Sequence, residues 1–451
     1  MSGLTKFLMQ EVEMPLVEIV ADMEDTGYSV DVQFFNDLRA QLEPKAEKAR
    51  ANIRKVAGDD DFNPNSDKQL ADLLYKKLQL KVLARTKKGS PSTTTQTLGW
   101  LKSKHEIILE ILSLKKLNKI ISTYCRIPDQ VDADGRLRVE FNQLAAETGR
   151  FTSPSVIQTI PKENDEYGLR KGFCAREGFT IVGADFRQQE LNVLAQVSGD
   201  KNLLKAIKTG LDLHGLAAIK VFGLDCEPNE VEAKYPEKRG QIKAIQFGLI
   251  YGKTAHGLAA SLGISKDEAQ QLIDDYFKQF PAISKFVSTI HRDLLRQGYV
   301  DDVFGRRRYF LVVKKKVPRK KYQQMTEQER ELLAKIGKAK RAAQNFVIQG
   351  ASATITKLAM IRCYHHITEK YGNDIKMILT LHDELQFEVR DDLVPGFAAE
   401  LPGLMCELGL ERFAFKLPLA VEVKAGPSWG EMSKWKGNEG SKDGDTNTVK
   451  G

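Results

Sequence analysis

The 451-residue sequence has few cysteines and no pattern that pairs them. They follow neither CxxC nor the Cys/His spacing of a zinc site, and an odd number argues against a closed set of disulfide bonds. This usage favours a reducing compartment. The five are Cys125, Cys174, Cys226, Cys363 and Cys406.

The sequence also lacks the segments that direct a chain into or across a membrane. Its first residues, MSGLTKFLMQEVEMPL, include Glu11 and Glu13 and show no basic stretch followed by an apolar one. No run reaches the roughly 18 apolar residues of a membrane helix. We therefore expect no membrane partner and a cytoplasmic location, in a bacterium or a virus-infected host cell, with an organelle as the open alternative.

No property of the composition is extreme. Hydrophobic residues make up 42% of the chain and charged residues 28%, which excludes a wholly disordered or collagen-like chain. The length suggests two to four domains, or one large protein built of subdomains. The net charge of +8 permits a polyanionic partner but does not require one.

Two regions read as strands within a largely helical chain. The run FTIVGAD, from Phe179, is short, apolar and rich in β-formers, and helical spacing follows it. The segment DIKMILTLHDELQFEVR, residues 374–390, reads as two strands joined by a tight turn, with alternating apolar side chains. Helical patterns cover 16–124, with a polar interruption, and 327–371.

Each of these strand regions ends or turns at an aspartate. Asp185 ends the first predicted strand and Asp383 lies at the tip of the hairpin. Alone, each is most simply a turn or cap residue, because the side chain bonds nearby backbone amides. If the strands are neighbours in one sheet, the two carboxylates meet at its edge, and such oxygen ligands suit Mg²⁺ ions that bridge to substrate phosphates.

A third segment, KRGQIKAIQFGLIYG, carries two cations and two aromatics at intervals of four: Arg239, Lys243, Phe247 and Tyr251. They share one helix face. An amphipathic helix with two core aromatics is the structural alternative. The layout also suits binding a triphosphate and then stacking on a sugar and base. The overlapping GLIYGKT, residues 248–254, is not a phosphate-binding P-loop, because the spacing of its glycines is one residue short.

In this order, DFRQQELN, RGQIKAIQFGLIYG and LHDE resemble motifs A, B and C of family A DNA polymerases. ETGRFTSPSVIQTIP, FGRRRY and KRAAQNFVIQG resemble further segments of that family, and the likeness spans about residues 14–432. It implies an α+β right-hand fold, with an antiparallel palm sheet, helical fingers and a helical thumb. The implied division is an N-terminal palm-associated segment (1–30), thumb (31–125), palm (126–198), fingers (199–340), palm again (341–432) and a disordered tail (433–451).

The resemblance also implies roles for individual residues. Asp185, Asp383 and the Phe186 carbonyl would bind two Mg²⁺ ions, for which Mn²⁺ can substitute, with Glu384 in support. Lys243 and Arg239 would hold the triphosphate, and Lys243 would act in catalysis. Phe247, Tyr251 and Gln188 would also contact the nucleotide, and Glu190 would exclude a ribose 2′-hydroxyl, although a surface helix Glu is the default reading. The residues expected to bind DNA are Arg150, Arg341, Asn345, Gln349 and His382.

The sequence departs from the family pattern in several places. Arg187, Gln189 and Asn192 replace the usual Ser, Ile and Arg of motif A, and Gln246 stands where Asn is usual. None of these changes removes an expected metal ligand. An insertion after FGRRRY contains a basic run from Lys314 to Lys321, which we expect to touch the DNA backbone.

The implied activity is template-directed DNA synthesis by a monomer that binds primer-template DNA and deoxynucleoside triphosphates. Few residues precede the segment EMPLVEIVADMEDTGYSVD, so we expect no proofreading exonuclease in this chain. Two alternatives stay open. One is a single-subunit RNA polymerase, and the other is a catalytically inactive subunit that only binds primed DNA.

Overall fold

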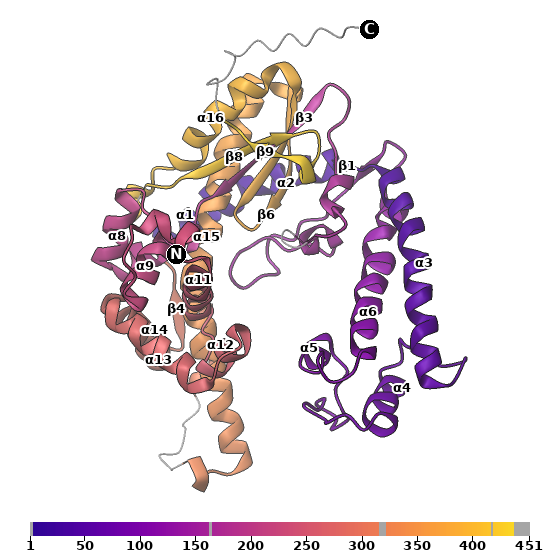
Figure 1. Ribbon diagram of the computed structural model, residues 1–451. Helices are drawn as coiled ribbons and strands as arrows, with labels where there is room; N and C mark the ends of the chain where they lie inside the picture. The colour runs from indigo at the N-terminus through magenta and orange to yellow at the C-terminus, as the bar shows by residue number, and fades with distance from the viewer. Residues whose placement is uncertain (1–2, 162–164, 315–321, 416–417, 437–451) are drawn as a thin grey trace.

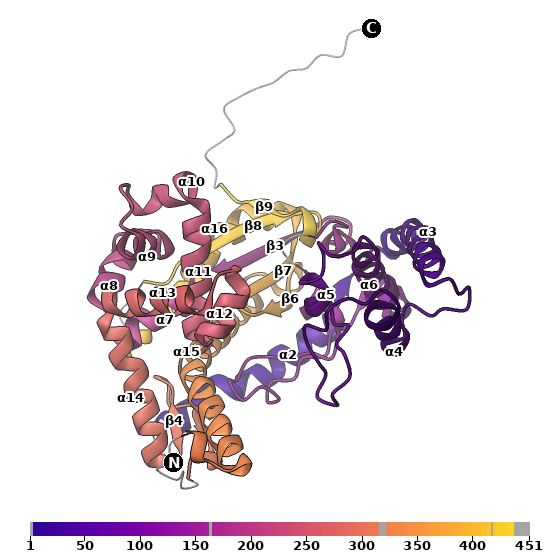
Figure 2. The same cartoon turned by 60° about the horizontal axis from the view of Figure 1, so that its bottom comes forward.

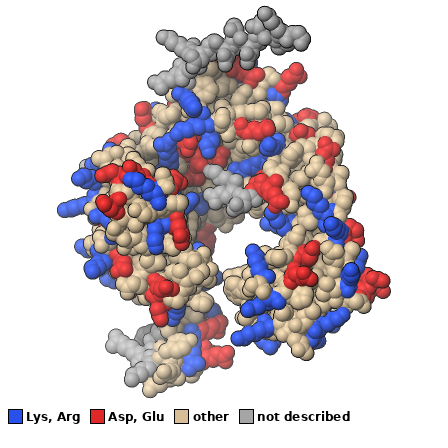
Figure 3. Space-filling model, viewed as in Figure 1, with Lys and Arg blue, Asp and Glu red and all other residues tan. Residues whose placement is uncertain are grey.

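The computed structural model describes residues 3–161, 165–314, 322–415 and 418–436. Figure 1 shows three parts: a β-sheet with its helices at the top, a helical arm on one side and a helical lobe on the other. Figure 3 shows this face of the molecule hollowed between the arm and the lobe.

The central sheet has five strands in the order β6-β7-β3-β8-β9, and each neighbouring pair is antiparallel. The register sets Asp185 opposite Glu384, so the end of β3 meets the start of β7. The predicted antiparallel sheet that carries both aspartates is therefore confirmed. Its strands are β3 (Phe179–Phe186), β6 (Ile375–Leu381), β7 (Glu384–Arg390), β8 (Val421–Gly426) and β9 (Ser433–Lys434).

Helices cover this sheet so fully that buried and exposed residues do not alternate along the β6–β7 hairpin. In β6 and β7 nearly every residue is buried, which requires cover on both faces. Phe387 of β7, for example, packs edge-to-face on Phe397 with ring centroids 5.1 Å apart. The covering helices are α2 (Pro15–Thr26) and α15 (Glu327–Lys370), which contact β6, and α16 (Val394–Cys406), which contacts β3 and β8.

The arm is an α-helical pair, α3 (Val32–Ala57) and α6 (Ile107–Thr123), with shorter elements at its far end. Asp31 caps α3 by accepting a hydrogen bond from the Phe34 amide at 2.9 Å. The buried residues of α3 recur at helical spacing, as in Leu38, Leu42 and Ala46, and face α6. The shorter elements are α4 (Asp67–Ala71), η2 (Asp72–Lys77) and α5 (Thr95–Gly99).

The lobe packs around α11 and α15, and Figure 2 shows its helices beside the sheet. Helix α15 begins with a capping box, in which Thr326 and Glu329 bond each other's backbone amides. It then runs from the lobe into the core under the sheet. The other lobe elements are α7 (Gln189–Ser198), α8 (Lys201–Lys208), α9 (Leu213–Phe222), α10 (Val231–Lys234), α11 (Pro236–Ile250), α12 (Ala255–Leu262), α13 (Lys266–Gln279), α14 (Pro281–Gln297), β4 (Tyr299–Asp301) and β5 (Arg307–Tyr309).

The N-terminal segment lies against the sheet through α2. Before it come α1 (Gly3–Phe7) and η1 (Leu8–Glu13), a short π-helix, and after it β1 (Tyr28–Ser29) pairs with β2 (Arg136–Leu137). The predicted association of residues 1–30 with the palm agrees with the contacts of α2, although the domain boundaries stay predictions.

Two expectations need correction. One helical stretch, Asp391–Phe413, has the length and apolar composition of a membrane span, which the sequence reading missed. Phe397 and Leu401 of this stretch lie in the core, and 39% of its apolar window is buried. The predicted tail also begins too early, because Ser433 and Lys434 form β9. The rest of the tail from 437, and 315–321 of the basic run, lie outside the described residues.

Candidate active site

The two aspartates come together at one edge of the sheet. The Phe186 amide donates a hydrogen bond to the Asp383 carbonyl at 3.1 Å, which ties the end of β3 to the β6–β7 turn. His382 adopts a φ of +59° in that turn, and Gln188 a φ of +49° just after β3. Such conformations are uncommon for residues other than glycine and often occur at functional sites.

Like charges make this edge electrostatically unfavourable by itself. Burial, and next the charge of Asp185, raise the pKa of Asp383 to about 7, while Arg150 partly offsets the rise. A divalent cation would relieve this repulsion. Within the described ranges no group of three or more His, Cys, Asp or Glu side chains could hold a metal. Two carboxylates and a carbonyl fit Mg²⁺, which usually keeps waters and takes substrate phosphates as its other ligands.

Glu384 lies behind these aspartates and is not part of the cavity wall. Its carboxylate accepts a hydrogen bond from the Gln386 amide nitrogen at 2.6 Å. The Gln386 amide oxygen in turn accepts one from the buried Tyr28 hydroxyl at 3.0 Å. Burial, followed by the charge of Glu384, raises the pKa of Tyr28 well above its usual range, so Tyr28 stays a donor. The chain of bonds fixes the start of β7 beside Asp185.

Helix α11 presents its cations and aromatics toward the aspartates. Arg239 forms an ion pair with Asp212 at 2.6 Å, and Gln188 donates to the same carboxylate at 3.2 Å. The rings of Phe247 and Tyr251 stack with centroids 6.1 Å apart and 15° between their planes. Both rings line the cavity, so the alternative that Phe247 and Tyr251 are simply core residues of an amphipathic helix does not describe them. Gly248, the first glycine of the rejected P-loop reading, lies inside α11.

Glu190 is a buried residue with two strong partners, which excludes the default surface reading. Its carboxylate accepts hydrogen bonds from Arg150 at 2.6 Å and from the Tyr251 hydroxyl at 2.9 Å, and only 8% of the residue is exposed. Burial and the charge of Glu190 raise the pKa of Tyr251 to about 12, so its hydroxyl remains protonated. These bonds join α7, the end of α11 and the segment that precedes η4 (Val156–Thr159).

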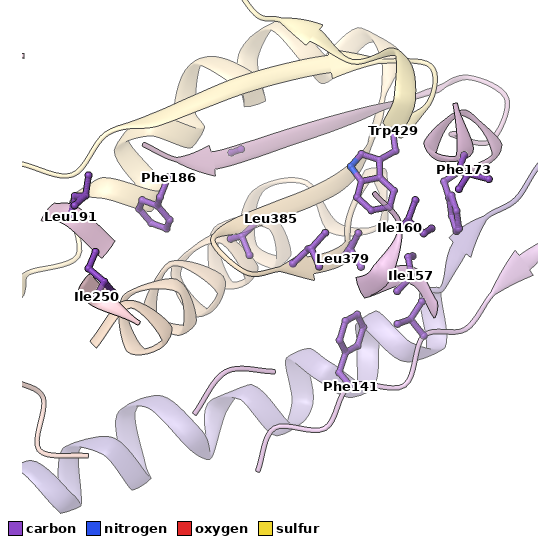
Figure 4. Close-up of a cluster of buried hydrophobic side chains, with 14 of the residues drawn as sticks. Phe141, Ile157, Ile160, Phe173, Phe186, Leu191, Ile250, Leu379, Leu385 and Trp429 are labelled. Atoms are coloured by element: carbon purple, nitrogen blue, oxygen red, sulfur yellow. The ribbon is translucent and has the colours of Figure 1, made fainter. Parts of the chain in front are cut away.

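Most of the predicted site residues line one cavity of about 450 Å³. A neighbouring cavity of about 810 Å³ shares Asp185, Phe186, Arg239 and Lys243 with it, so the two form one cleft at the edge of the sheet. In Figure 4, Phe186 and Leu191 lie among the buried apolar side chains beneath this edge. The predicted residues in the smaller cavity are Arg150, Asp185, Phe186, Gln188, Glu190, Arg239, Lys243, Phe247, Tyr251, His382 and Asp383.

The other three predicted DNA-binding residues lie on α15, outside that lining. Asn345 donates a hydrogen bond to Gln349 at 3.1 Å. Arg341 packs against Gly252, where an added Cβ would come within 2.6 Å of the Arg341 side chain. Gly252 also has a φ of +65°, so both space and conformation require glycine at this position. Their expected contacts with DNA stay predictions.

Asp212 and His214 are among the residues of the site that the sequence reading missed. Asp212 caps α9 by accepting hydrogen bonds from the amides of His214 and Gly215, and it holds Arg239 as well. His214 lines the same cavity as Lys243 and Phe247. The only available signal was an Asp-x-His at the start of a predicted helix, which reads as an ordinary cap.

Comparisons with known proteins agree with this geometry. The sequence model for "DNA polymerase family A" matches residues 32–431. The chain is 36% identical over 434 residues to DNA polymerase I of Chloroflexus aurantiacus, covering 94% of this chain and 43% of that protein. It is 35% identical to the thermostable DNA polymerase I of Thermus aquaticus, covering 94% and 48%. The chain thus spans less than half the length of these curated relatives.

A solved structure matches the fold over nearly the whole chain. It is the POL domain of Pol1 from M. smegmatis in complex with DNA primer-template and dNTP. The match has a TM-score of 0.82 at 31% identity and covers 94% of this chain and 71% of that one. The predicted right-hand fold is therefore confirmed.

Proposed function

The chain belongs to DNA polymerase family A, and we propose that it extends the 3′-hydroxyl of a DNA primer along a template, using deoxynucleoside triphosphates and releasing pyrophosphate. One observation carries the proposal. Asp185, Asp383, Arg239 and Lys243 all line the same cavity. Carboxylates that can hold metal ions and cations that can bind phosphates are the groups that phosphoryl transfer requires.

Asp185, Asp383 and the Phe186 carbonyl would hold two Mg²⁺ ions, and Mn²⁺ could replace them. When bound there, such ions would supply Lewis-acid activation of the primer hydroxyl and stabilisation of the charge on the leaving oxygen. Lys243 and Arg239 would bind the triphosphate and offset charge that builds on the transferred group. Arg239 would then divide its donors between Asp212 and the phosphates, and Lys243 would protonate the pyrophosphate.

Phe247 and Tyr251 would contact the sugar and base of the incoming nucleotide, because aromatic rings stack on bases without regard to sequence. Figure 3 shows a hollow between the arm and the lobe, and we propose that the primer-template duplex lies there. The M. smegmatis relative, solved with primer-template DNA and dNTP, supports this placement. We propose that one copy of the chain suffices, because the cavity is formed by a single chain.

A primer-extension assay tests the proposal. A labelled primer on a template is incubated with Mg²⁺ and either deoxy- or ribonucleotides. Extension with deoxynucleotides only is the expected result. Extension with ribonucleotides would favour an RNA polymerase, and tight DNA binding without any extension would favour an inactive DNA-binding subunit.

We expect Glu190→Ala to admit ribonucleotides. The shorter side chain leaves room for a 2′-hydroxyl, and a group of that size in a pocket is worth about 10- to 100-fold in selectivity. The ratio of kcat/KM for a ribonucleotide to that for the matching deoxynucleotide should rise by that factor. Glu190→Gln is the control, because it keeps the size of the side chain and should stay selective. An unchanged ratio in the alanine variant would exclude Glu190 as the sugar gate.

A further inference from the structure

The larger cavity of the cleft extends beyond the part that the sugar and base would occupy. It measures about 810 Å³ and shares Asp185, Arg239 and Lys243 with the smaller cavity. Phe247 and Tyr251, the expected contacts of sugar and base, line only the smaller one. A nucleotide whose base lies on those rings therefore has its phosphates at the shared wall, and the larger cavity continues beyond them.

The leaving group of the proposed reaction departs in this direction. In an in-line displacement the pyrophosphate leaves on the side of the phosphorus opposite the attacking primer hydroxyl. The outer two phosphates of the nucleotide are that leaving group, so they enter the larger cavity when the bond breaks. The sugar and base, now joined to the primer, remain on the other side of the shared wall.

One cation lines the larger cavity and not the smaller one. It is Arg187, the residue after β3, and it is exposed. Asp212 and Glu232, also on this wall, both pair with Arg239. Glu422 has a lysine partner, whereas the Arg187 guanidinium forms no ion pair in the described part of the chain. Its planar fork matches the oxygens of a phosphate, so Arg187 has donors available for an anion in this cavity.

Hydrogen bonds of the backbone hold Arg187 in place. Its amide donates to the Ala420 carbonyl at 2.8 Å, and its carbonyl accepts from the Asn192 side chain at 3.2 Å. Gln188 follows with a φ of +49°, where the chain turns into α7. Arg187 and Asn192 are both departures from the family pattern, and here they contact each other. The backbone is thus anchored on both sides, while the exposed side chain is free to meet a ligand.

We propose that the larger cavity is a pyrophosphate site and that Arg187 binds the product there before it leaves the protein. The inference rests on the polymerase function proposed above. In synthesis, the bond between the α-phosphorus and the bridging oxygen breaks, and pyrophosphate keeps both electrons of that bond. In the reverse reaction, an oxygen of pyrophosphate bound at this site attacks the last phosphodiester, and the primer 3′-oxygen leaves and takes up a proton.

Inhibition by added pyrophosphate tests the site. Arg187→Ser should raise the inhibition constant of pyrophosphate in primer extension about tenfold, because a charge-assisted hydrogen bond is lost. Arg187→Lys keeps the charge without the fork and should raise it about threefold. Lys208→Ser, at the end of α8 and outside the lining, removes the same charge and should leave the constant unchanged. Equal constants in the wild type and Arg187→Ser would overturn the proposal.

The kinetics of both directions separate binding of the product from binding of the triphosphate. A contact made only with bound pyrophosphate does not alter kcat/KM for the deoxynucleotide, because it stabilises neither the substrate complex nor the transition state. In Arg187→Ser, kcat and KM for pyrophosphate in the reverse reaction should therefore rise together. A fall in kcat/KM for the deoxynucleotide as large as the change in the inhibition constant would mean that Arg187 binds the triphosphate, and would overturn the proposal.

Calorimetry gives a readout that does not depend on turnover. Pyrophosphate is titrated with Mg²⁺ into the protein without DNA, where no reaction can occur. The wild type and Lys208→Ser should bind it with equal affinity, and Arg187→Ser about tenfold more weakly, because the same hydrogen bond is lost. Equal binding by all three would overturn the proposal. No primer extension by a wild type that shows this difference would instead refute the proposed function and leave the pyrophosphate site standing.

Discussion

Replacing Asp383 by Asn should reduce primer extension by about 1000-fold or more, because the charge that holds the catalytic ions contributes several kcal/mol to the transition state. Asn keeps the size of the side chain, and the backbone bond from Phe186 to residue 383 does not involve it. The variant should therefore fold and bind DNA normally. Single-turnover extension measures the loss, and fluorescence anisotropy of labelled primer-template measures binding.

A matched control lies at the opposite end of the same strands. Asp391 follows β7 and accepts a hydrogen bond from Thr180 on β3, at 2.7 Å, far along the sheet from the cavity. Asp391→Asn makes the same chemical change and should leave extension within about twofold of the wild type, as surface substitutions usually do. Equal activity in both variants would show that Asp383 is not a metal ligand.

The parts of this site that could be predicted are those with a strong local pattern. Phe179 to Asp185 is an apolar run rich in β-formers, and Arg239, Lys243, Phe247 and Tyr251 share a helix face by spacing alone. Both patterns depend only on near neighbours in the sequence, and the structure reproduces both elements.

The parts that could not be predicted depend on distant partners. Strand β8 is short and pairs with β3, more than 200 residues earlier, so nothing local marks it. Asp212 reads as a helix cap, and only the tertiary fold shows that it also holds Arg239. Glu190 illustrates the same limit, because its burial results from partners on two other elements.

A cluster of ion pairs joins the N-terminal segment to the lobe. It is the clearest example of a contact between residues that lie far apart in the sequence. Glu13 of η1 accepts from the Lys357 ammonium of α15 at 2.8 Å and from Arg306 at 2.5 Å. Gln143 donates to the Glu13 carboxylate as well. Only 1% of the Lys357 side chain is exposed. The buried Lys357 and the half-buried Arg306 therefore both pair with one carboxylate.

The protonation states agree with this arrangement. Burial raises the pKa of Glu13, but Lys357 and Arg306 outweigh it, so that the pKa is lowered overall. Burial lowers the pKa of Lys357 from the usual 10.5 to about 8, although Glu13 opposes the change. Because folding then releases a proton from Lys357 between pH 8 and 10.5, the stability contributed by this group rises with pH across that window.

We expect Glu13→Gln to lower the free energy of unfolding by about 3 kcal/mol at pH 7, because it leaves the buried Lys357 and the half-buried Arg306 without a counter-charge. The loss should shrink as pH rises toward 10, since Lys357 can then become neutral, while Arg306 stays charged and keeps part of the cost. Urea unfolding followed by circular dichroism at both pH values measures this. Glu43→Gln, which breaks the exposed Arg39–Glu43 pair, is the control and should change little at either pH. A loss independent of pH would mean that Lys357 does not titrate in the folded protein, and no loss would mean that the cluster does not stabilise the fold.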